Sequence, residues 1–191
     1  MDTKFYKVVR PFVSFIIKLL FHPKVVGLNN IPKTGRVVLA GNHTKWLDPV
    51  TLVGIQKRQI HFLAKEELFH GITSFIAKGM GCVPVNRKIH DKNALSSAED
   101  FLNKDLCIGI FPEGTINRGK DVIMPFKIGA VKMSHDTNSK IVPFIITGKY
   151  KIFGKSVRIE FLKPISIGED LSKENDKLMD IVKNKLKENR K

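Results

Sequence analysis

Short apolar runs alternate with amphipathic stretches along most of the chain. The apolar runs suit buried strands, and they cover residues 25–35 (ending in turn residues), 36–40, 60–64, 82–85, 106–111, 141–147 and 156–161. Between them, apolar residues at helical spacing predict helices over residues 49–55, 65–68, 71–78, 94–103, 128–134 and 171–191. Strands that alternate with helices indicate an α/β fold, a single layered domain with a mixed, largely parallel sheet flanked by helices.

The N-terminal segment differs from the rest because residues 5–21 are nearly all apolar. A narrow polar stripe interrupts them at helical spacing and consists of Lys4, Lys7, Ser14 and Lys18, with Arg10 beside it. This pattern predicts an amphipathic helix with a wide apolar face. Pro11 is expected to kink or break that helix near its middle.

This segment has four possible interpretations. A membrane span needs about 20 predominantly apolar residues, and Lys18 divides the stretch into pieces that are too short. A secretory signal would need a small-x-small cleavage site, which residues 19–27 lack. We therefore expect residues 1–24 to lie in a membrane interface and residues 25–191 to form the domain. The N-terminal segment would be either one kinked helix or a helical hairpin with the segment after Pro23. The alternative is a helix packed on the domain's own core.

The composition is that of a globular protein of 191 residues. Hydrophobic residues make up 42% and charged residues 27%, which excludes wholesale disorder and a polytopic membrane protein. The 33 Lys and Arg residues outnumber the 18 Asp and Glu residues, for a net charge of +15. Such a charge points to an anionic partner: nucleic acid, an anionic membrane surface, or an acidic substrate or carrier.

The two cysteines, Cys82 and Cys107, lie in apolar stretches and not in a C-x-x-C pair. This spacing argues against a zinc site and against a disulfide framework. We expect buried free thiols in a reducing compartment.

A polar loop over residues 42–48 directly follows the predicted strand at residues 36–40 and contains His43 and Asp48. Open α/β sheets place their ligands at such strand ends. A carboxylate beside a histidine fixes the tautomer and orientation of the ring, so that the other ring nitrogen can accept a proton from a hydroxyl. Taken alone, a histidine and an aspartate five residues apart arise often by chance.

Three further segments carry candidate chemistry. Residues 111–115, at the end of the strand over residues 106–111, read Phe-Pro-Glu-Gly-Thr. In this segment Glu113 can accept hydrogen bonds from a polyol or orient cations. The alternative is that the segment is only a helix-capping turn. Residues 83–87 end in Arg87, whose planar side chain suits a phosphate, although a solvated arginine is the common alternative. Residues 141–144 form an apolar strand with a proline, which by itself indicates core packing.

Together and in this order, the four segments resemble the motifs of the glycerolipid acyltransferases, and among these the 1-acylglycerol-3-phosphate acyltransferases. The resemblance extends from about Val25 to Phe161. The matching residues are Asn42, His43 and Asp48 for N-H-x-x-x-x-D, Gly81 to Arg87 for G-x-x-x-x-x-R, Phe111 to Thr115 for F-P-E-G-T, and Val142-Pro143 for the last motif. The first and third motifs in combination are highly specific.

This resemblance implies a reaction and roles for residues. His43 would take the proton of the sn-2 hydroxyl of lysophosphatidate, and Asp48 would orient His43. The hydroxyl oxygen would attack an acyl thioester of acyl carrier protein or coenzyme A, without a covalent acyl-enzyme, a metal or another cofactor. The residues implied in substrate binding are Arg87, Glu113, Gly114, Thr115, Arg118 and Lys127. An anionic phospholipid membrane is the implied partner, and the cytoplasmic face of the cell membrane the implied location.

One departure from the family pattern keeps the acceptor open. Many members have an arginine directly after F-P-E-G-T, where this chain has Ile116, so either Arg118 supplies the charge or phosphate binding relies on Arg87 and Lys127. Glycerol 3-phosphate, another lysophospholipid or an amino-acid lipid is the alternative acceptor. A lipid-binding protein without turnover is a further alternative, against which the intact His43 and Asp48 argue. Nucleic-acid binding is disfavoured because the lysines are dispersed and aromatics do not interleave with them.

Overall fold

The structure is a computed structural model that describes residues 3–86, 89, 91–154 and 157–190. Its strands are β1 (Lys24–Val26), β2 (Val37–Gly41), β3 (Ile60–Lys65), β4 (Val83–Val85), β5 (Cys107–Ile110), β6 (Lys140–Gly148) and β7 (Val157–Phe161). Its helices are α1 (Lys4–Phe21), α2 (Asp48–Ile55), α3 (Gly71–Gly79), α4 (Lys92–Asn103), α5 (Gly129–Asp136) and α6 (Leu171–Glu188), with short 3-10 helices η1 (Leu28–Asn30) and η2 (Glu66–Phe69).

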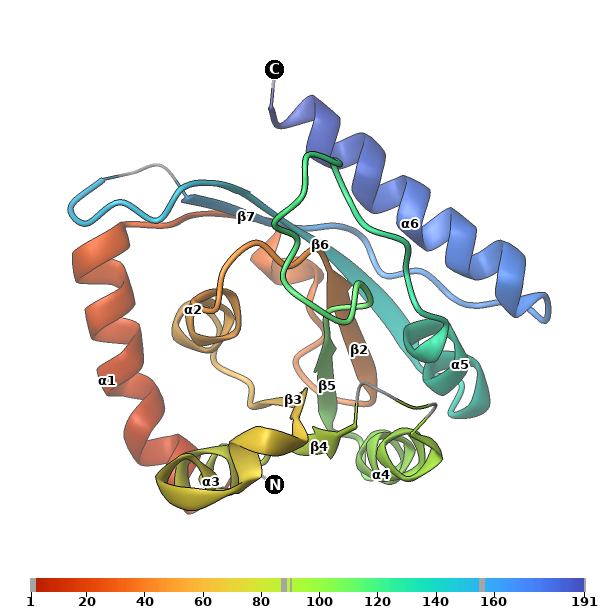
Figure 1. The fold of residues 1–191 in the computed structure, drawn as a ribbon, viewed down its shortest axis with the longest axis horizontal. Coiled ribbons are helices and arrows are strands. Elements are labelled where there is room, and N and C mark those ends of the chain that lie inside the picture. The colour runs from red at the N-terminus through yellow and green to blue at the C-terminus, as the bar shows by residue number, and fades with distance from the viewer. Residues whose placement is uncertain (1–2, 87–88, 90, 155–156, 191) are drawn as a thin grey trace.

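The strands form one sheet in the order β1-β7-β6-β2-β5-β3-β4, with helices packed on both faces (Figure 1). All neighbouring strands pair in parallel except β6 and β7, which are antiparallel. The predicted α/β domain with a mixed, largely parallel sheet is therefore confirmed.

Two hydrophobic cores lie on the two faces of the sheet. Alternate residues of β2 point to opposite sides, so that Val37 and Leu39 join one core and Val38 and Ala40 the other. The first core is covered by α1 and α2, and the second by α4, α5 and α6. A strand buried on both faces must be apolar at every position, which explains the continuous apolar run of β2.

Helix α1 runs unbroken from Lys4 to Phe21, so neither the expected break at Pro11 nor a helical hairpin occurs. Pro11 lies on the exposed side, where water can bind the carbonyl of Lys7 that a proline leaves unpaired. The predicted polar stripe of this helix includes Ser14, but Ser14 does not share the exposure of the lysines, because it is buried together with Tyr6 and Ile17. No helix within the described part of the chain is long and apolar enough to cross a membrane.

The largest error in the predicted elements concerns the strand over residues 25–35. The observed strand ends at Val26, because Gly27 takes the left-handed backbone conformation (φ 69°) and starts η1. The Asn30 side-chain amide then donates to the carbonyl of Phe161, which fixes this turn against β7. The other described elements agree with the predicted ones within a few residues at each end; Ser156 and Lys191 lie outside the described residues.

Candidate active site

The first and third motifs meet at one edge of the sheet because their strands are neighbours. β2 pairs in parallel with β5, and Ala40 is opposite Ile110. His43 and Glu113 each follow three residues later, so the register places them side by side. β6, the neighbour of β2 on its other side, ends at the same edge. His43 and Glu113, each predicted to follow a strand, therefore lie together at this edge of the sheet.

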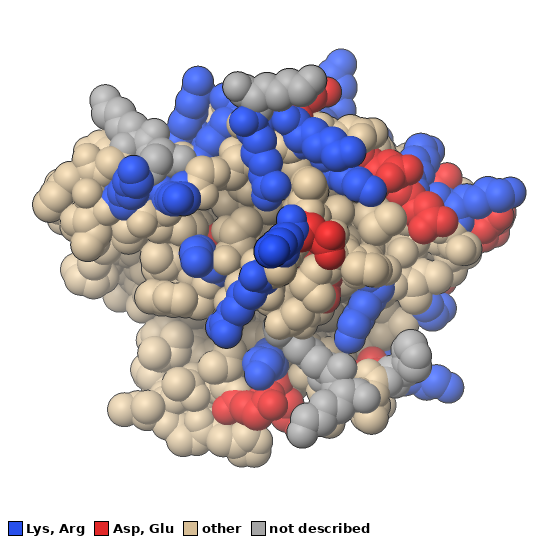
Figure 2. Space-filling model, turned by 45° about the horizontal axis from the view of Figure 1, so that its top comes forward, with Lys and Arg blue, Asp and Glu red and all other residues tan. Residues whose placement is uncertain are grey.

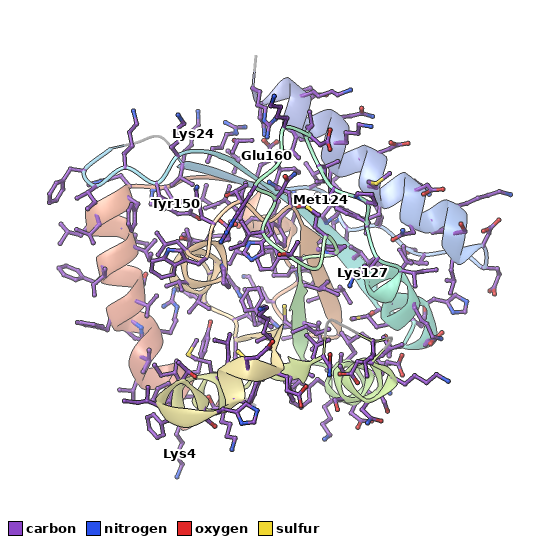
Figure 3. The ribbon with its side chains drawn as sticks, in the orientation of Figure 1. Lys4, Lys24, Met124, Lys127, Tyr150 and Glu160 are labelled. Atoms are coloured by element: carbon purple, nitrogen blue, oxygen red, sulfur yellow. The ribbon has the colours of Figure 1, made fainter. Side chains whose placement is uncertain are left out.

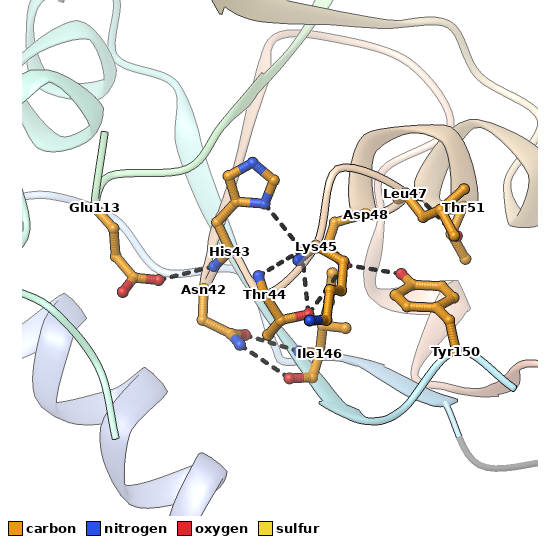
Figure 4. A network of polar contacts seen from close by, with 10 residues as sticks. All are labelled: Asn42, His43, Thr44, Lys45, Leu47, Asp48, Thr51, Glu113, Ile146 and Tyr150. Atoms are coloured by element: carbon orange, nitrogen blue, oxygen red, sulfur yellow. Dashed lines mark hydrogen bonds and ion pairs between the residues drawn. The ribbon is translucent and has the colours of Figure 1, made fainter. Parts of the chain in front are cut away.

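Asn42 anchors the loop that follows β2. Its side-chain amide donates to the carbonyl of Ile146 over 2.9 Å, and its side-chain oxygen accepts from the Ile146 N–H over 2.8 Å. The side chain thereby continues the pairing of β2 with β6 by one step. This pairing fixes the starting point of the loop that carries His43 (Figure 4).

His43 and Asp48 form a buried pair. The His43 Nδ1 lies 2.9 Å from the Asp48 Oδ2, and the two side chains are 9% and 0% exposed. The His43 ring stacks on Phe111, with centroids 4.0 Å apart and an interplanar angle of 18°. Because the carboxylate accepts from Nδ1, the opposite nitrogen, Nε2, has the lone pair that can accept a proton.

Asp48 receives hydrogen bonds from several directions (Figure 4). Its Oδ2 also accepts from the backbone N–H groups of Thr44 (2.6 Å) and Lys45 (2.8 Å). Its Oδ1 accepts from the hydroxyl of Tyr150 over 2.8 Å. These donors hold the carboxylate in one orientation, and its position in the first turn of α2 favours its negative charge.

The side chain of Glu113 links its own turn to two other backbone segments, those of His43 and Met124, and the residue is only 4% exposed. Its Oε1 accepts from the N–H of His43 over 2.8 Å, and its Oε2 from the N–H of Met124 over 2.9 Å. Burial raises the pKa of this carboxyl, and the two N–H donors act against that rise. Both oxygens therefore have partners within the protein, and the expected contact of Glu113 with a polyol stays a prediction.

The remaining predicted binding residues lie around this turn. Gly114 takes a positive φ of 71° and donates to the Phe111 carbonyl, which closes the turn. The Lys127 side chain lies over Gly114, at 3.0 Å from the place that a β-carbon would occupy, and Thr115 is exposed beside it. Arg118 is exposed in the following loop, and Arg87 lies outside the described residues.

A cavity of about 650 Å³ adjoins this turn. Phe111, Pro112, Gly114 and Lys127 form one side of its largely apolar wall, and the remainder includes Leu63 of β3 and residues of α4 and α5 such as Leu95 and Met133. Phe111 lines the cavity, and its ring stacks on His43. The site thus combines a proton acceptor with an adjacent apolar space.

Neither cysteine has the properties of a nucleophile. Burial raises the pKa of Cys107 to about 12 and that of Cys82 to about 11, so both stay protonated at neutral pH. Cys107 is buried, as predicted, whereas Cys82 is half-buried and precedes β4 by one residue. No group of three or more His, Cys, Asp or Glu side chains that could hold a metal ion occurs among the described residues.

Sequence reasoning missed two residues of the site. Tyr150, in the connection from β6 to β7, contacts Asp48 from 102 residues away, and in the sequence it stood out only as an aromatic near basic residues. Asn117 donates its backbone N–H to the carbonyl of His43 over 2.9 Å. A backbone contact carries no signal in the residue type, and the Tyr150 contact depends on the path of a loop. In Figure 3, Tyr150 lies on the side of α1 and Lys127 on the side of α5.

The chain is similar to known proteins over most of its length. Residues 22–147 match the model of the family described as Acyltransferase. A 1-acyl-sn-glycerol-3-phosphate acyltransferase of Bacillus subtilis (strain 168) is 33% identical over 169 residues, which are 87% of this chain and 82% of that protein. The protein of the same name from Borreliella burgdorferi is 32% identical over 136 residues, 70% of this chain and 54% of that protein.

The fold also has a counterpart among crystal structures. The 1-acyl-sn-glycerophosphate (LPA) acyltransferase PlsC from Thermotoga maritima superposes with a TM-score of 0.75, over 97% of this chain and 81% of that one. The two sequences are 21% identical, so this comparison concerns the fold alone. The shared fold includes the α/β layers described above.

Proposed function

The chain belongs to the acyltransferase family, and from this premise we propose that it transfers a fatty acyl group from an acyl thioester to the sn-2 hydroxyl of 1-acylglycerol 3-phosphate, giving phosphatidate. The observation that carries the proposal is the buried His43–Asp48 pair, 2.9 Å apart, beside the intact Phe-Pro-Glu-Gly-Thr turn. The names of the relatives support the acceptor.

In the proposed reaction, Nε2 of His43 accepts the proton of the acceptor hydroxyl as its oxygen attacks the carbonyl carbon of the thioester. Asp48 stabilises the imidazolium that forms. The tetrahedral intermediate collapses with cleavage of the C–S bond, and His43 returns the proton to the departing thiolate. The high thiol pKa values of Cys82 and Cys107 support direct transfer without an acyl-enzyme on a cysteine.

We place the acceptor phosphate at the mouth of the site, near Lys127 and Thr115. Lys127 supplies a positive charge, and its chain lies against Gly114, where any larger residue would displace it. The exposed Arg118 is the candidate for the arginine that many family members have at the position of Ile116. Arg87 stays a predicted phosphate ligand from the sequence.

The cavity beside Phe111 is the proposed site of an acyl chain. Its wall is largely apolar, and its volume of about 650 Å³ lies in the range of ligand pockets. The donor is an acyl thioester of acyl carrier protein or coenzyme A. Lysine and arginine outnumber acidic side chains on the face shown in Figure 2, which supports attraction of either acidic donor.

The test is transfer of a labelled acyl group to lysophosphatidate in detergent micelles, with acyl carrier protein and coenzyme A thioesters compared. We expect wild-type protein to form labelled phosphatidate, and to form less product from lysophosphatidylcholine or glycerol 3-phosphate. Folded protein that acylates one of the other acceptors faster would overturn the proposed acceptor. Failure with every acceptor would overturn the proposed reaction.

We further propose that the protein binds the cytoplasmic face of an anionic phospholipid membrane through α1, α3 and the connection from β6 to β7. The exposed apolar residues of these elements, which we call the apolar edge, are Val8, Phe12, Phe15, Leu19, Ile72, Phe75, Ile76, Ile152 and Phe153. The elements are joined, because Phe5 of α1 packs edge-on against Phe75 and the N–H of Phe153 donates to the carbonyl of Leu20. Exposed apolar side chains gathered on elements that contact one another are typical of an interaction site.

Charge supports the same membrane partner. Lys4, Lys7 and Lys18 are exposed on α1, along the apolar positions of the same helix. Each lysine near an anionic membrane surface contributes about 1 kcal/mol to binding. The free thiols Cys82 and Cys107 fit the reducing cytoplasmic side.

Replacing Phe12 or Phe75 with aspartate should weaken binding to anionic phospholipid vesicles by about tenfold or more, because each change removes a large apolar contact with the bilayer and adds a negative charge. Vesicle sedimentation measures the bound fraction. Leu28→Asp is the matched control, since Leu28 is 38% exposed but lies on η1, outside the apolar edge. Equal binding by all variants, or an equal loss in the control, would contradict the proposed surface.

A further inference from the structure

Tyr150 is placed differently from the other hydrogen-bond donors to Asp48. The donors to Oδ2 lie in residues 43–45, within the same loop as the aspartate, whereas Tyr150 comes from the connection between β6 and β7. Its hydroxyl is 2.8 Å from Oδ1, and the Thr44 hydroxyl lies further from that oxygen, at 3.2 Å. Tyr150 therefore links the loop that carries His43 and Asp48 to a separate part of the fold.

The Tyr150 ring is itself held in place. It packs edge-on against Phe21, with ring centroids 5.5 Å apart and an interplanar angle of 88°, and it lies against the core beneath α1. The same connection is tied to α1 by the hydrogen bond from Phe153 to Leu20. Burial and the negative charge of Asp48 both raise the pKa of the Tyr150 hydroxyl, so the hydroxyl stays protonated and can donate a hydrogen bond at neutral pH.

We propose that Tyr150 is a positioning residue for acyl transfer, acting through Asp48: its hydroxyl fixes the carboxylate so that Oδ2 stays aligned with Nδ1 of His43. This inference rests on the proposed function of the His43–Asp48 pair. Without the hydroxyl, Oδ1 keeps the longer bond from Thr44, so the carboxylate is held mainly through Oδ2 and gains freedom to turn about its bond to the β-carbon. Because Tyr150 contacts Asp48 and not the Nε2 side of His43, its loss should affect the chemical step and not substrate binding.

The test is Tyr150→Phe, which removes the hydroxyl and keeps the ring that packs on Phe21. Because a hydrogen bond to a charged group is lost, we expect kcat to fall by about 10- to 100-fold, with KM for both substrates changed less than about twofold. Tyr6→Phe is the matched control, since Tyr6 is the other tyrosine of the chain and its buried hydroxyl donates to the carbonyl of Arg58. We expect that control to keep wild-type kcat.

A double-mutant cycle tests whether Tyr150 acts through Asp48. In an Asp48→Ala background, Tyr150→Phe should lower kcat by less than about twofold, because no carboxylate remains for the hydroxyl to hold. Unchanged kcat in the single Tyr150→Phe variant would overturn the inference. So would an equal loss in both backgrounds, or a loss that appears as a rise in KM.

A spectroscopic measurement separates this inference from the proposed function. The downfield proton resonance of the His43 Nδ1–H reports its hydrogen bond to Asp48 and requires no substrate. Tyr150→Phe should move or broaden this resonance, and Tyr6→Phe should leave it in place. If the wild type acylates no acceptor, the proposed function fails, and this resonance alone then decides whether Tyr150 positions the His43–Asp48 pair. An unchanged resonance in Tyr150→Phe would overturn that role of Tyr150.

Discussion

Replacing His43 with alanine should lower kcat for acyl transfer to lysophosphatidate by about 100- to 10,000-fold, the usual contribution of a general base. The structure gives the reason. Asp48 and Phe111 fix the ring at the carboxyl edge of β2, and Nε2 has the lone pair that can accept the hydroxyl proton. Removing the imidazole leaves an unactivated hydroxyl to attack the thioester, while the other binding residues stay in place. Initial rates at saturating concentrations of both substrates measure the effect.

A second histidine of the chain provides the control. His135 also contacts a carboxylate, with its Nδ1 3.0 Å from an Asp136 oxygen, but it is only half-buried, near the end of α5, and the site residues described above do not include it. His135→Ala should therefore keep wild-type kcat. Thermal unfolding of both variants shows whether the lost stacking on Phe111 matters for stability. Turnover by folded His43→Ala within about tenfold of wild type would contradict the assignment of the base.

The strands and helices could be predicted from the sequence because burial selects apolar residues at every position of a strand that is covered on both faces. The run Val37–Gly41 is apolar throughout because the two cores cover both of its faces, and an amphipathic pattern such as that of α6 marks a helix packed on one side. Strand ends were less predictable, since they depend on single turns. The strand expected over residues 25–35 ends at Val26, where the left-handed conformation of Gly27 turns the chain away from the sheet.

The site was predictable where a role requires a particular residue type. His43 and Asp48 are separated by a short loop, so a motif records their contact. Contact of Glu113 with a ligand stays a prediction, and the structure adds a role that the sequence did not indicate, since its carboxylate accepts from the backbone N–H groups of His43 and Met124. Because almost every residue has a backbone N–H group, no sequence pattern predicts which of these groups will bind the Glu113 carboxylate.

The N-terminal segment illustrates a limit of periodicity. Ser14 shares the helical spacing of the lysines, yet it faces the core, because α1 packs on α2 and turns one edge of its polar stripe inward. The alternative placement, a helix packed on the domain's own core, is observed, while the membrane interface stays a prediction. The helix buries Tyr6, Ile17 and Phe21 in the domain and still exposes the apolar positions at Val8 and Phe12.

Asp48→Asn should lower kcat by about 100- to 1,000-fold, the range found when one preorganised electrostatic contact is removed from an active site. The replacement has nearly the same shape, and the surrounding donors determine its orientation. Nδ1 of His43 and the N–H groups of Thr44 and Lys45 converge on Oδ2, which selects the amide oxygen for that position. The amide nitrogen then faces the Tyr150 oxygen, which can accept a hydrogen bond.

The substitution therefore removes a charge while it keeps the orientation of His43. The expected loss has one cause: the imidazolium that forms during proton transfer no longer has an anion beside it. Asp170→Asn, at the start of α6, is the matched control, because Asp170 also lies at a helix N-terminus and asparagine caps helices equally well. The control should keep wild-type kcat. If Asp48→Asn retained kcat while Asp48→Ala lost it, orientation alone would explain the role of Asp48, and stabilisation of charge would have to be abandoned.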